Sequence, residues 1–401
     1  MQITELSLAN QRVLLRVDFN VPMDADGFIT DDSRIQAALP TINYLIEKKA
    51  KVILVSHLGR PKKDKEGKFD KLKFSLGAVA AHLSELVSAS VLFAEDCLGA
   101  EVEEIISELQ AGEILLLENV RFYPEEEAGD KVFAEKLSKL ADVYINDAFG
   151  TAHRDHASTC TVAQFFPHER KAFGFLMKKE VENGKKLLLQ PKTNFVAIIG
   201  GAKVSDKILL LRSLLSKVET IIIGGAMAFT FIKAKGGNVG KSLVEEDKMD
   251  LALSLLSEAE AAGVKILLPV DALAADSFDN NSPFATYEAQ NIPAERMGLD
   301  IGEKSQNLFA AAIEGATTIF WNGPMGVFEF SNFAQGTASV AQAVVTATEK
   351  GAFSLVGGGD SVAALQQMGK GDEVSFISTG GGAMLELIEN GDLVGVAAIG
   401  G

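Results

Sequence analysis

Two doubly wound, parallel-sheet α/β (Rossmann-like) domains joined by a hinge helix are the fold that this 401-residue sequence predicts. In both halves, short β-branched runs alternate with longer amphipathic segments, which is typical of right-handed βαβ units. Several of the short runs are apolar throughout, as strands buried on both faces should be. The length itself suits two to three domains of ordinary size.

The expected strands are distributed evenly along the chain. Four lie in the first half and five in the second, namely 12–17, 51–56, 113–117, 142–146, 194–199, 219–223, 264–270, 317–321 and 352–356. Helical periodicity links them, most clearly over 204–218, where Ile208, Leu211, Leu215 and Val218 recur on one face. A charged amphipathic helix over 177–189, ended by Pro191, is interpreted as the connection between the halves. On pattern alone, a crossover helix inside one larger domain remains an alternative.

The overall charge restricts the class of ligand. With 38 basic and 54 acidic residues, the formal charge of −16 argues against a nucleic-acid binder and against a binder of anionic membranes. A small anionic ligand remains possible because local charge governs a site. Only Cys97 and Cys160 occur, so no disulfide framework is expected and a cytoplasmic location is predicted. The longest apolar stretch, 221–232, is shorter than the roughly 20 residues of a membrane span.

Three glycine-rich turns in the second half point to a nucleotide polyphosphate. Each turn is expected between a strand and a helix, at 200–203, 357–361 and 380–382. Glycine lets backbone N–H groups approach an anion, and a helix N-terminus adds partial positive charge. Lys203 and Lys207 would share a face at a helix start, and Asp360 would suit Mg²⁺. For a single turn, glycine kept for packing would be the simpler explanation.

Polar and basic residues follow the expected strands of the first half. Asp18 and Asn20 follow the first strand, and Arg34 precedes a helix. His57, Arg60, Arg121 and Arg154 come after later strands. Arginine suits bidentate binding of phosphate or carboxylate. A lone arginine in a loop is usually a solvated charge, but several at one sheet edge predict an anion site.

The residues that carry these patterns also match a known family. The matching stretches run in order along the chain: RVDFNVP (16–22), SHLGRP (56–61), LLENVRF (116–122), NDAFGTAHR (146–154), GFLMKKE (174–180), GGAKVSDK (200–207), GGAMAFTF (224–231), WNGPMGVFE (321–329), GGGDS (357–361) and STGGGA (378–383). The sequence therefore closely resembles the phosphoglycerate kinase family over essentially its whole length.

The resemblance implies an enzyme of two domains. An N-terminal domain (1–172) would bind 3-phosphoglycerate or 1,3-bisphosphoglycerate. A linker helix (173–190) would follow, then a C-terminal domain (191–384) for ADP or ATP with Mg²⁺, and a last segment (385–401) that returns to the first domain. A hinge would close for catalysis, and the enzyme would act as a monomer without nucleic-acid or membrane partners. The alternative is another Mg-nucleotide phosphotransferase acting on a different small carboxylate.

The resemblance also implies roles for individual residues. Substrate binding is expected from Asp18, Asn20, Arg34, His57, Arg60, Arg121 and Arg154. Nucleotide binding is expected from Gly201, Lys203, Lys207, Gly224, Gly298, Asn322, Pro324, Val327, Glu329, Gly357, Gly358, Gly359, Asp360 and Ser361. Catalytic roles fall to Arg34, Lys203, Gly358 and Gly381, and the metal ligand would be Asp360. No general base is expected, because a carboxylate acceptor with a pKa of ~3.5–4 is already ionised at pH 7.

Overall fold

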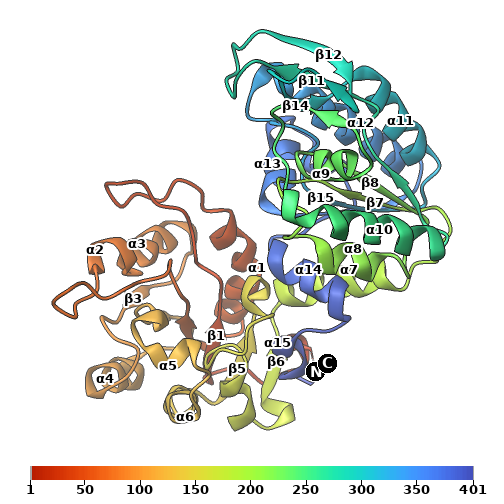
Figure 1. Ribbon diagram of the computed structural model, residues 1–401. Helices are drawn as coiled ribbons and strands as arrows, with labels where there is room; N and C mark the ends of the chain where they lie inside the picture. Colours follow the sequence, from red (N-terminus) through yellow and green to blue (C-terminus); the bar gives the residue numbers. More distant parts are fainter. Residues whose placement is uncertain (1, 401) are drawn as a thin grey trace. The chain divides into compact units, whose positions relative to one another are not determined.

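The computed structural model describes residues 2–400 and divides into two compact units (Figure 1). The first unit contains the chain up to Glu182 together with the residues from Asp392 onward, and the second runs from Asn183 to Gly391. Each unit is built around a six-stranded parallel sheet, which confirms the predicted fold class. No helix among the described residues is long and apolar enough to cross a membrane.

The sheet of the first unit has the strand order β3-β4-β2-β1-β5-β6, and all neighbours pair in parallel. Its strands are β1 (Arg12–Arg16), β2 (Lys51–Val55), β3 (Val91–Phe93), β4 (Ile114–Leu116), β5 (Val143–Asn146) and β6 (Lys171–Phe173). The four predicted strands are present. The other two, β3 and β6, are three-residue edge strands, and such short, half-exposed strands leave little apolar signal in the sequence.

Alternate residues of each central strand point to opposite faces of this sheet, and each face has its own core. Along β1, Val13 and Leu15 join one cluster and Leu14 joins the other. The first cluster includes residues of α1 (Ser33–Glu47) and α3 (Gly77–Leu86), and the second includes residues of α4 (Ala100–Glu108) and α6 (Lys131–Ser138). The short helices are α2 (Lys71–Phe74), α5 (Pro124–Glu127) and α15 (Val394–Ala397).

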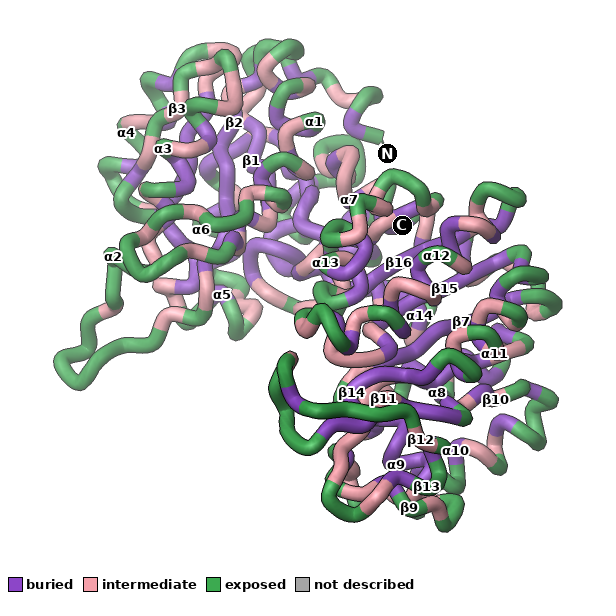
Figure 2. Tube along the Cα trace, turned by 90° about the horizontal axis from the view of Figure 1, so that it is seen from above, coloured by how far each residue is buried: buried purple, intermediate pink, exposed green. Residues whose placement is uncertain are grey.

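The sheet of the second unit has the order β10-β8-β7-β15-β16-β17 and is also parallel. Its strands are β7 (Phe195–Ile199), β8 (Thr220–Ile223), β10 (Lys265–Leu267), β15 (Thr318–Asn322), β16 (Phe353–Gly357) and β17 (Phe376–Ile377). The five predicted strands are present, and β17 is an additional two-residue edge strand. Figure 2 shows the central strands of both sheets as buried.

Helices pack on both faces of this second sheet, and two smaller sheets extend the unit. The helices are α8 (Ile208–Leu214), α9 (Met227–Ala234), α10 (Met249–Ala261), α11 (Glu303–Glu314), α12 (Gln335–Glu349), α13 (Gly359–Gln367) and α14 (Gly381–Asn390). Strands β11 (Asp271–Ala275), β12 (Phe284–Glu288) and β14 (Met297–Ile301) form a separate antiparallel sheet, and β9 (Asn238–Val239) pairs with β13 (Asn291–Ile292). The sequence did not predict these strands, because β12 is largely exposed (Figure 2) and lacks an apolar face.

Helix α7 (Phe175–Leu188) contains the point at which the two units divide. It covers nearly all of the predicted 177–189 helix. Its first turn is fixed on the first unit, since the backbone N–H of Phe175 donates to the Thr41 hydroxyl (2.9 Å) and that of Met177 to the Asp147 carboxylate (2.9 Å). Burial raises the pKa of Asp147 to about 6, because its charged form is held away from water.

A buried aspartate begins helix α11 in place of an ordinary cap. The residue before the helix is Gly302, which has no side chain to cap with. Asp271, 3 % exposed, instead accepts bonds from the backbone N–H groups of Lys304 (3.0 Å) and Ser305 (2.8 Å) and from the Ser305 hydroxyl (2.6 Å). One carboxylate from β11 therefore satisfies donors that the helix itself leaves unpaired.

We predict that Asp271→Ala lowers the free energy of unfolding of the second unit by about 2–4 kcal/mol, the sum of a lost cap and buried donors left unpaired. Trp321 is the only tryptophan and is buried in β15, so urea unfolding followed by its fluorescence reports on this unit. Asp250→Ala, at an exposed position in the first turn of α10, is the control and should cost less than about 1 kcal/mol. Equal losses in the two variants would contradict the capping role.

Candidate functional site

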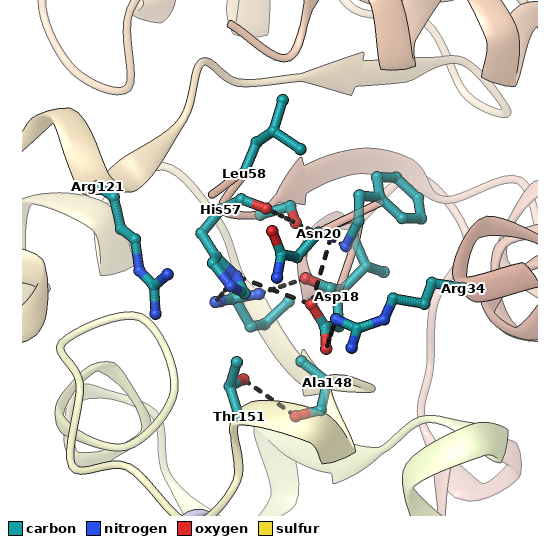
Figure 3. Close-up of polar contacts among 12 residues, drawn as sticks. Asp18, Asn20, Arg34, His57, Leu58, Arg121, Ala148 and Thr151 are labelled. Atoms are coloured by element: carbon teal, nitrogen blue, oxygen red, sulfur yellow. Dashed lines mark hydrogen bonds and ion pairs between the residues drawn. The ribbon is translucent and has the colours of Figure 1, made fainter. Parts of the chain in front are cut away.

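The first cluster lies at the carboxyl ends of the strands of the first unit. Asp18 follows β1, His57 follows β2, and Arg34 stands in the first turn of α1. Figure 3 shows these side chains converging with Asn20 and Arg121. Arg34 Nη1 lies 2.9 Å from Asp18 Oδ2, and about a third of the arginine side chain remains exposed. The predicted arginine and aspartate therefore meet directly.

The His57 side chain is uncharged although several charged groups lie near it. Its side chain is 2 % exposed, its Nδ1 lies 3.3 Å from Arg16 Nη2, and the same atom is 3.8 Å from Asp18 Oδ1. Burial, reinforced by repulsion from Arg16, Arg121, Arg154 and Arg34, holds the pKa of His57 well below its usual range. The imidazole is therefore neutral at physiological pH and can act only through hydrogen bonds.

Arg121 is a buried cation whose donors are only partly used. Its side chain lies in the 3₁₀ turn Val120–Phe122, and its Nη1 donates to the Gly59 carbonyl (2.6 Å). Its Nε is 3.4 Å from a carboxylate oxygen of Glu127, while the buried Nη2 has no hydrogen-bond partner within residues 2–400. Burial lowers the pKa of Arg121 to about 10, so the group still carries its charge at pH 7. A buried guanidinium with a free N–H donor is suited to bind an anionic oxygen.

The remaining predicted residues of this unit differ in how closely they join the cluster. Asn20 accepts a bond from the Gly59 backbone N–H (2.7 Å), which fixes its amide. Arg154 donates from Nε to His153 Nε2 (3.2 Å), and its charge lowers the pKa values of His57 and Arg121. Arg60 is exposed and has no hydrogen-bond or ion-pair partner in the described chain. The structure thus gathers six of the seven predicted residues and leaves Arg60 at the margin.

A buried network behind this cluster was not predicted from the sequence. Arg16, Glu126 and Ser158 are almost completely buried and hydrogen-bonded to one another through Ser158. Arg16 belongs to the predicted strand and to the stretch RVDFNVP, but nothing in one sequence shows that a strand arginine faces inward. Glu126 stands within three consecutive glutamates, which resemble a solvated run.

The second cluster surrounds a cavity of about 560 Å³ in the second unit. Its lining includes six of the predicted nucleotide residues, namely Gly201, Gly298, Pro324, Val327, Glu329 and Asp360. Apolar side chains that were not predicted complete the wall, among them Phe229, Leu243, Phe278, Met297 and Leu299. They come from segments far apart in the sequence, so spacing could not reveal them. An apolar cavity with a few polar groups suits a small organic ligand such as a nucleoside.

Close packing against residues of the cavity wall explains two predicted glycines, Gly224 and Gly298. A Cβ atom on Gly224 would collide with the sulfur of Met325, and one on Gly298 with the ring of Phe229. Because Met325 and Phe229 both line the cavity, any larger residue at Gly224 or Gly298 would displace a wall.

Asn322 connects the glycine turns to a lysine. Its Oδ1 accepts a bond from Lys207 Nζ, and its Nδ2 donates to the Gly357 carbonyl (2.9 Å). Gly358 has φ +91°, and a Cβ there would lie 2.6 Å from Asn322 Nδ2, so this turn requires glycine. Burial lowers the pKa of Lys207, against the opposing effect of Asp360.

The other members of the glycine turns are close neighbours. The Ser361 hydroxyl accepts a bond from the Gly323 backbone N–H, and a Cβ on Gly381 would lie 3.1 Å from Gly358 Cα. The second and third turns are therefore packed together. Gly359 has open space around it, and Asp360 is exposed in the first turn of α13 beside the cavity.

One local expectation was wrong. Lys203 and Lys207 do not share a face of a helix, because α8 begins only at Ile208. Gly201 has φ +131°, and the Lys207 backbone N–H bonds back to the Val204 carbonyl (3.0 Å), so a turn separates β7 from α8. Lys207 is half-buried, whereas Lys203 is exposed and has no hydrogen-bond or ion-pair partner among the residues described.

The described residues contain no group of three or more histidine, cysteine, aspartate or glutamate side chains that could hold a metal by themselves. A cation at Asp360 would therefore take most of its ligands from the bound molecule and from water. Mg²⁺ commonly binds in this way, through one or two carboxylates and substrate phosphates.

Comparison with known proteins gives matches over nearly the whole chain. The family model described as phosphoglycerate kinase matches residues 3–391. Phosphoglycerate kinase from Synechococcus sp. (strain JA-2-3B'a(2-13)) is 51 % identical over 98 % of this chain and 96 % of its own length. The cytosolic phosphoglycerate kinase of Triticum aestivum is 52 % identical over the same shares. The solved phosphoglycerate kinase from Coxiella burnetii superposes with a TM-score of 0.87 at 39 % identity, covering 100 % of this chain and 98 % of that one.

A buried carboxyl group in the wall of the cavity generates a pH-dependent prediction. Asp300, 3 % exposed, accepts bonds from the backbone N–H groups of Gly336 (2.7 Å) and Ile301 (2.9 Å). Burial raises its pKa to about 7, well above the ~3.9 of an unfolded aspartate. Between these values the folded protein holds a proton that the unfolded chain releases. The contribution of protonated Asp300 to the free energy of unfolding is therefore fully present below pH ~4 and is lost as the pH rises through 7.

We predict that, from pH 5 to pH 7, the wild type loses about 2–3 kcal/mol of stability relative to Asp300→Asn, which cannot ionise. Urea unfolding followed by Trp321 fluorescence at several pH values measures the difference. Asp250→Asn, at an exposed position in the same unit, is the control, and its difference in stability from the wild type should stay nearly constant from pH 5 to pH 7. A difference for Asp300→Asn that does not vary with pH would refute the prediction.

Proposed function

This chain belongs to the phosphoglycerate kinase family, and we propose that its two clusters each bind one of the two substrates. The enzyme transfers a phosphoryl group reversibly between the acyl phosphate of 1,3-bisphosphoglycerate and ADP, a step of glycolysis, giving 3-phosphoglycerate and ATP. The relatives compared above are all phosphoglycerate kinases, and no observation favours another small carboxylate as the acceptor.

The cluster of the first unit is the proposed phosphoglycerate site. The observation that carries this assignment is the buried Arg121, whose Nη2 has no hydrogen-bond partner in the part of the chain that the structure describes. Arg34, Arg154 and neutral His57 lie in the same cluster, and their donors suit phosphate and carboxylate oxygens. Asp18 and Asn20 offer oxygen atoms that can accept bonds from a hydroxyl group. Arg60, exposed nearby, would join the site only when ligand is bound.

The cavity of the second unit is the proposed nucleotide site. Its apolar walls suit adenosine, and its lining includes Gly201 of the first glycine turn and Asp360, which follows the glycines of the second turn. There, backbone N–H groups and the N-termini of α13 and α14 favour phosphate oxygens. Lys207 and the unpaired Lys203 would neutralise the phosphate chain.

Magnesium binding is proposed at Asp360. The carboxylate is exposed beside the cavity and near the lysine that would contact the phosphates, so the residues present suit Mg²⁺ bound with a nucleotide. When bound, the ion neutralises charge on the phosphate oxygens. No further carboxylate is needed, because the nucleotide and water supply the other ligands.

The chemistry needs charge neutralisation and alignment rather than a base. The acceptor carboxylate is already ionised at pH 7, so no residue has to remove a proton. Arg34 would place positive charge beside the transferred phosphoryl group from the first unit. Lys203 would do the same from the proposed nucleotide site. The backbone N–H groups of Gly358 and Gly381 add fixed dipoles that need no reorganisation during the reaction.

We also propose that the protein acts as a cytoplasmic monomer. The two cysteines are buried and unpaired, as expected in a reducing compartment, and one relative is named cytosolic. The monomeric state rests on the family resemblance.

We predict that Arg34→Ala lowers turnover by roughly 10²–10³-fold, because one charge that stabilises the transition state is removed. The side chain is partly exposed on the first turn of α1, so folding should be retained. Turnover is measured in a coupled assay with 3-phosphoglycerate and Mg-ATP, and nucleotide binding by calorimetry should stay normal. Arg212→Ala, which removes an exposed pair with Glu258, is the control. Near-normal turnover of Arg34→Ala would remove the arginine from the mechanism.

We predict that Asp360→Asn raises the Mg²⁺ concentration for half-maximal activity by roughly tenfold, as expected from loss of one charged ligand. Magnesium titrations at fixed ATP measure the shift, and calorimetry with and without the ion separates metal from nucleotide binding. Asp372→Asn, at an exposed position in the same unit, should titrate like the wild type. An unchanged requirement in Asp360→Asn would show that the metal is bound elsewhere.

A further inference from the structure

Arg16 contacts the Nδ1 edge of the His57 ring, and the proposal above gives it no direct contact with a ligand. It is the last residue of β1 and is 1 % exposed. Its guanidinium donates from Nε to the Ser158 hydroxyl oxygen (2.8 Å) and from Nη1 to the Val17 carbonyl. The remaining nitrogen, Nη2, lies 3.3 Å from His57 Nδ1. These three contacts fix the plane of the guanidinium beside the imidazole.

The chemistry of this contact determines where the imidazole carries its proton. A guanidinium has five N–H donors and no acceptor, so a hydrogen bond from Arg16 requires His57 Nδ1 to accept. A neutral imidazole that accepts at Nδ1 carries its proton on Nε2. Asp18 Oδ1 lies 3.8 Å from Nδ1, which is too far to accept a hydrogen bond from it. The other oxygen of the same carboxylate, Oδ2, is paired with Arg34. No group in the described chain hydrogen-bonds Nε2 of His57.

A second layer fixes Arg16 in turn. Glu126 is fully buried in α5, and its two carboxylate oxygens accept from the Ser158 hydroxyl (2.6 Å) and the Ser158 backbone N–H (2.8 Å). A hydroxyl has one proton, and Ser158 donates it in the hydrogen bond to Glu126. The Ser158 oxygen can therefore only accept from Arg16 Nε. Reversing the hydroxyl would leave a buried carboxylate oxygen and a buried N–H donor unpaired.

We propose that Glu126 and Ser158 are positioning residues that act through Arg16 to hold His57 as the neutral Nε2–H tautomer, which donates one hydrogen bond to an oxygen of the bound phosphoglycerate. The inference rests on the assignment of this cluster to phosphoglycerate. The arrangement makes His57 a directional donor rather than a fifth positive charge.

The surrounding charges explain why a neutral donor suits this place. The positive charges of four arginines act on the ring, namely Arg16 from β1, Arg34 from α1, Arg121 from its 3₁₀ turn and Arg154 beyond β5. The carboxylate of Asp18, 3.8 Å from Nδ1, supplies an opposing charge. An imidazolium would repel four arginines and would have no acceptor left for Arg16. A neutral ring keeps both the contact to Arg16 and a free N–H.

The tautomer can be read directly without ligand. Long-range ¹H–¹⁵N correlation spectra of ¹⁵N-histidine-labelled protein distinguish Nδ1–H, Nε2–H and imidazolium, and the chain has only five histidines. His57→Gln identifies the signals. We expect the Nε2–H pattern for His57 from pH 6 to pH 8. An Nδ1–H or imidazolium pattern at pH 7 overturns the proposal.

Two variants test the second layer. Glu126→Gln places an N–H donor where Ser158 needs an acceptor, and Ser158→Ala removes the hydroxyl. Both should give His57 a mixture of tautomers, and Ser158→Thr, which keeps a hydroxyl, should restore the Nε2–H pattern. Glu125→Gln removes the same charge from an exposed neighbour on the same helix and should leave the spectrum unchanged. A wild-type spectrum in Glu126→Gln and Ser158→Ala would overturn the positioning role.

Kinetics adds a readout that separates this inference from the assignment of the site. The KM for 3-phosphoglycerate should rise roughly tenfold in Glu126→Gln and Ser158→Ala, as for one weakened hydrogen bond to an anion, with a smaller change in kcat. Calorimetric titration of the wild type with 3-phosphoglycerate tests the assignment separately. Binding of 3-phosphoglycerate together with an Nδ1–H ring would refute only the inference. An Nε2–H ring without binding would refute the assignment of the site.

Discussion

The register of the parallel strands brings the segments that carry the proposed sites to one edge of each sheet. In the first unit, Arg16 pairs with Val55 on one side and with Asn146 on the other, so three strands end side by side. In the second unit, Asn322 pairs with both Ile199 and Gly357. Residues that follow these positions therefore leave the sheet at one edge, as the general rule for ligand sites in open α/β sheets requires. The backbone ladder, rather than any side chain, brings together segments that are far apart in the sequence.

The two clusters offer different groups to an anion, namely arginine side chains in the first and glycine backbone in the second. The first concentrates arginine side chains, of which Arg121 is buried and Arg34 is partly exposed, with Asp18 as a local counter-charge. The second relies on glycine, because backbone groups approach one another where a side chain would collide, as at Gly358 and Asn322. An arginine cluster suits a small, highly charged molecule. A glycine surface beside an apolar cavity suits a larger ligand with one charged end.

The central strands, the fold class, the arginine cluster and the glycine turns could be predicted from the sequence, since apolar runs and glycine or arginine at their ends leave a direct pattern. Gly298, Pro324, Val327 and Glu329 of the cavity were expected only from the family resemblance. The edge strands β3, β6 and β17 could not, because two or three residues carry too little periodicity. The turn before α8 was missed because Lys203 and Lys207 have helical spacing without helical backbone. Arg16 and Glu126 were missed as site residues because their roles come from burial, which a single sequence does not display for charged residues.

The segment from Asp392 to the described end of the chain completes the first unit. The Gly395 backbone N–H bonds to the Ala152 carbonyl (2.8 Å), Lys171 Nζ donates to the Ala398 carbonyl (2.9 Å), and Ile399 joins the core around Leu14. The second unit is continuous in sequence, and all of it leaves the ribosome before residues 392–400 do. It can therefore assemble while the first unit still lacks part of its core. The first unit can complete that core only after the whole of the second unit has been made.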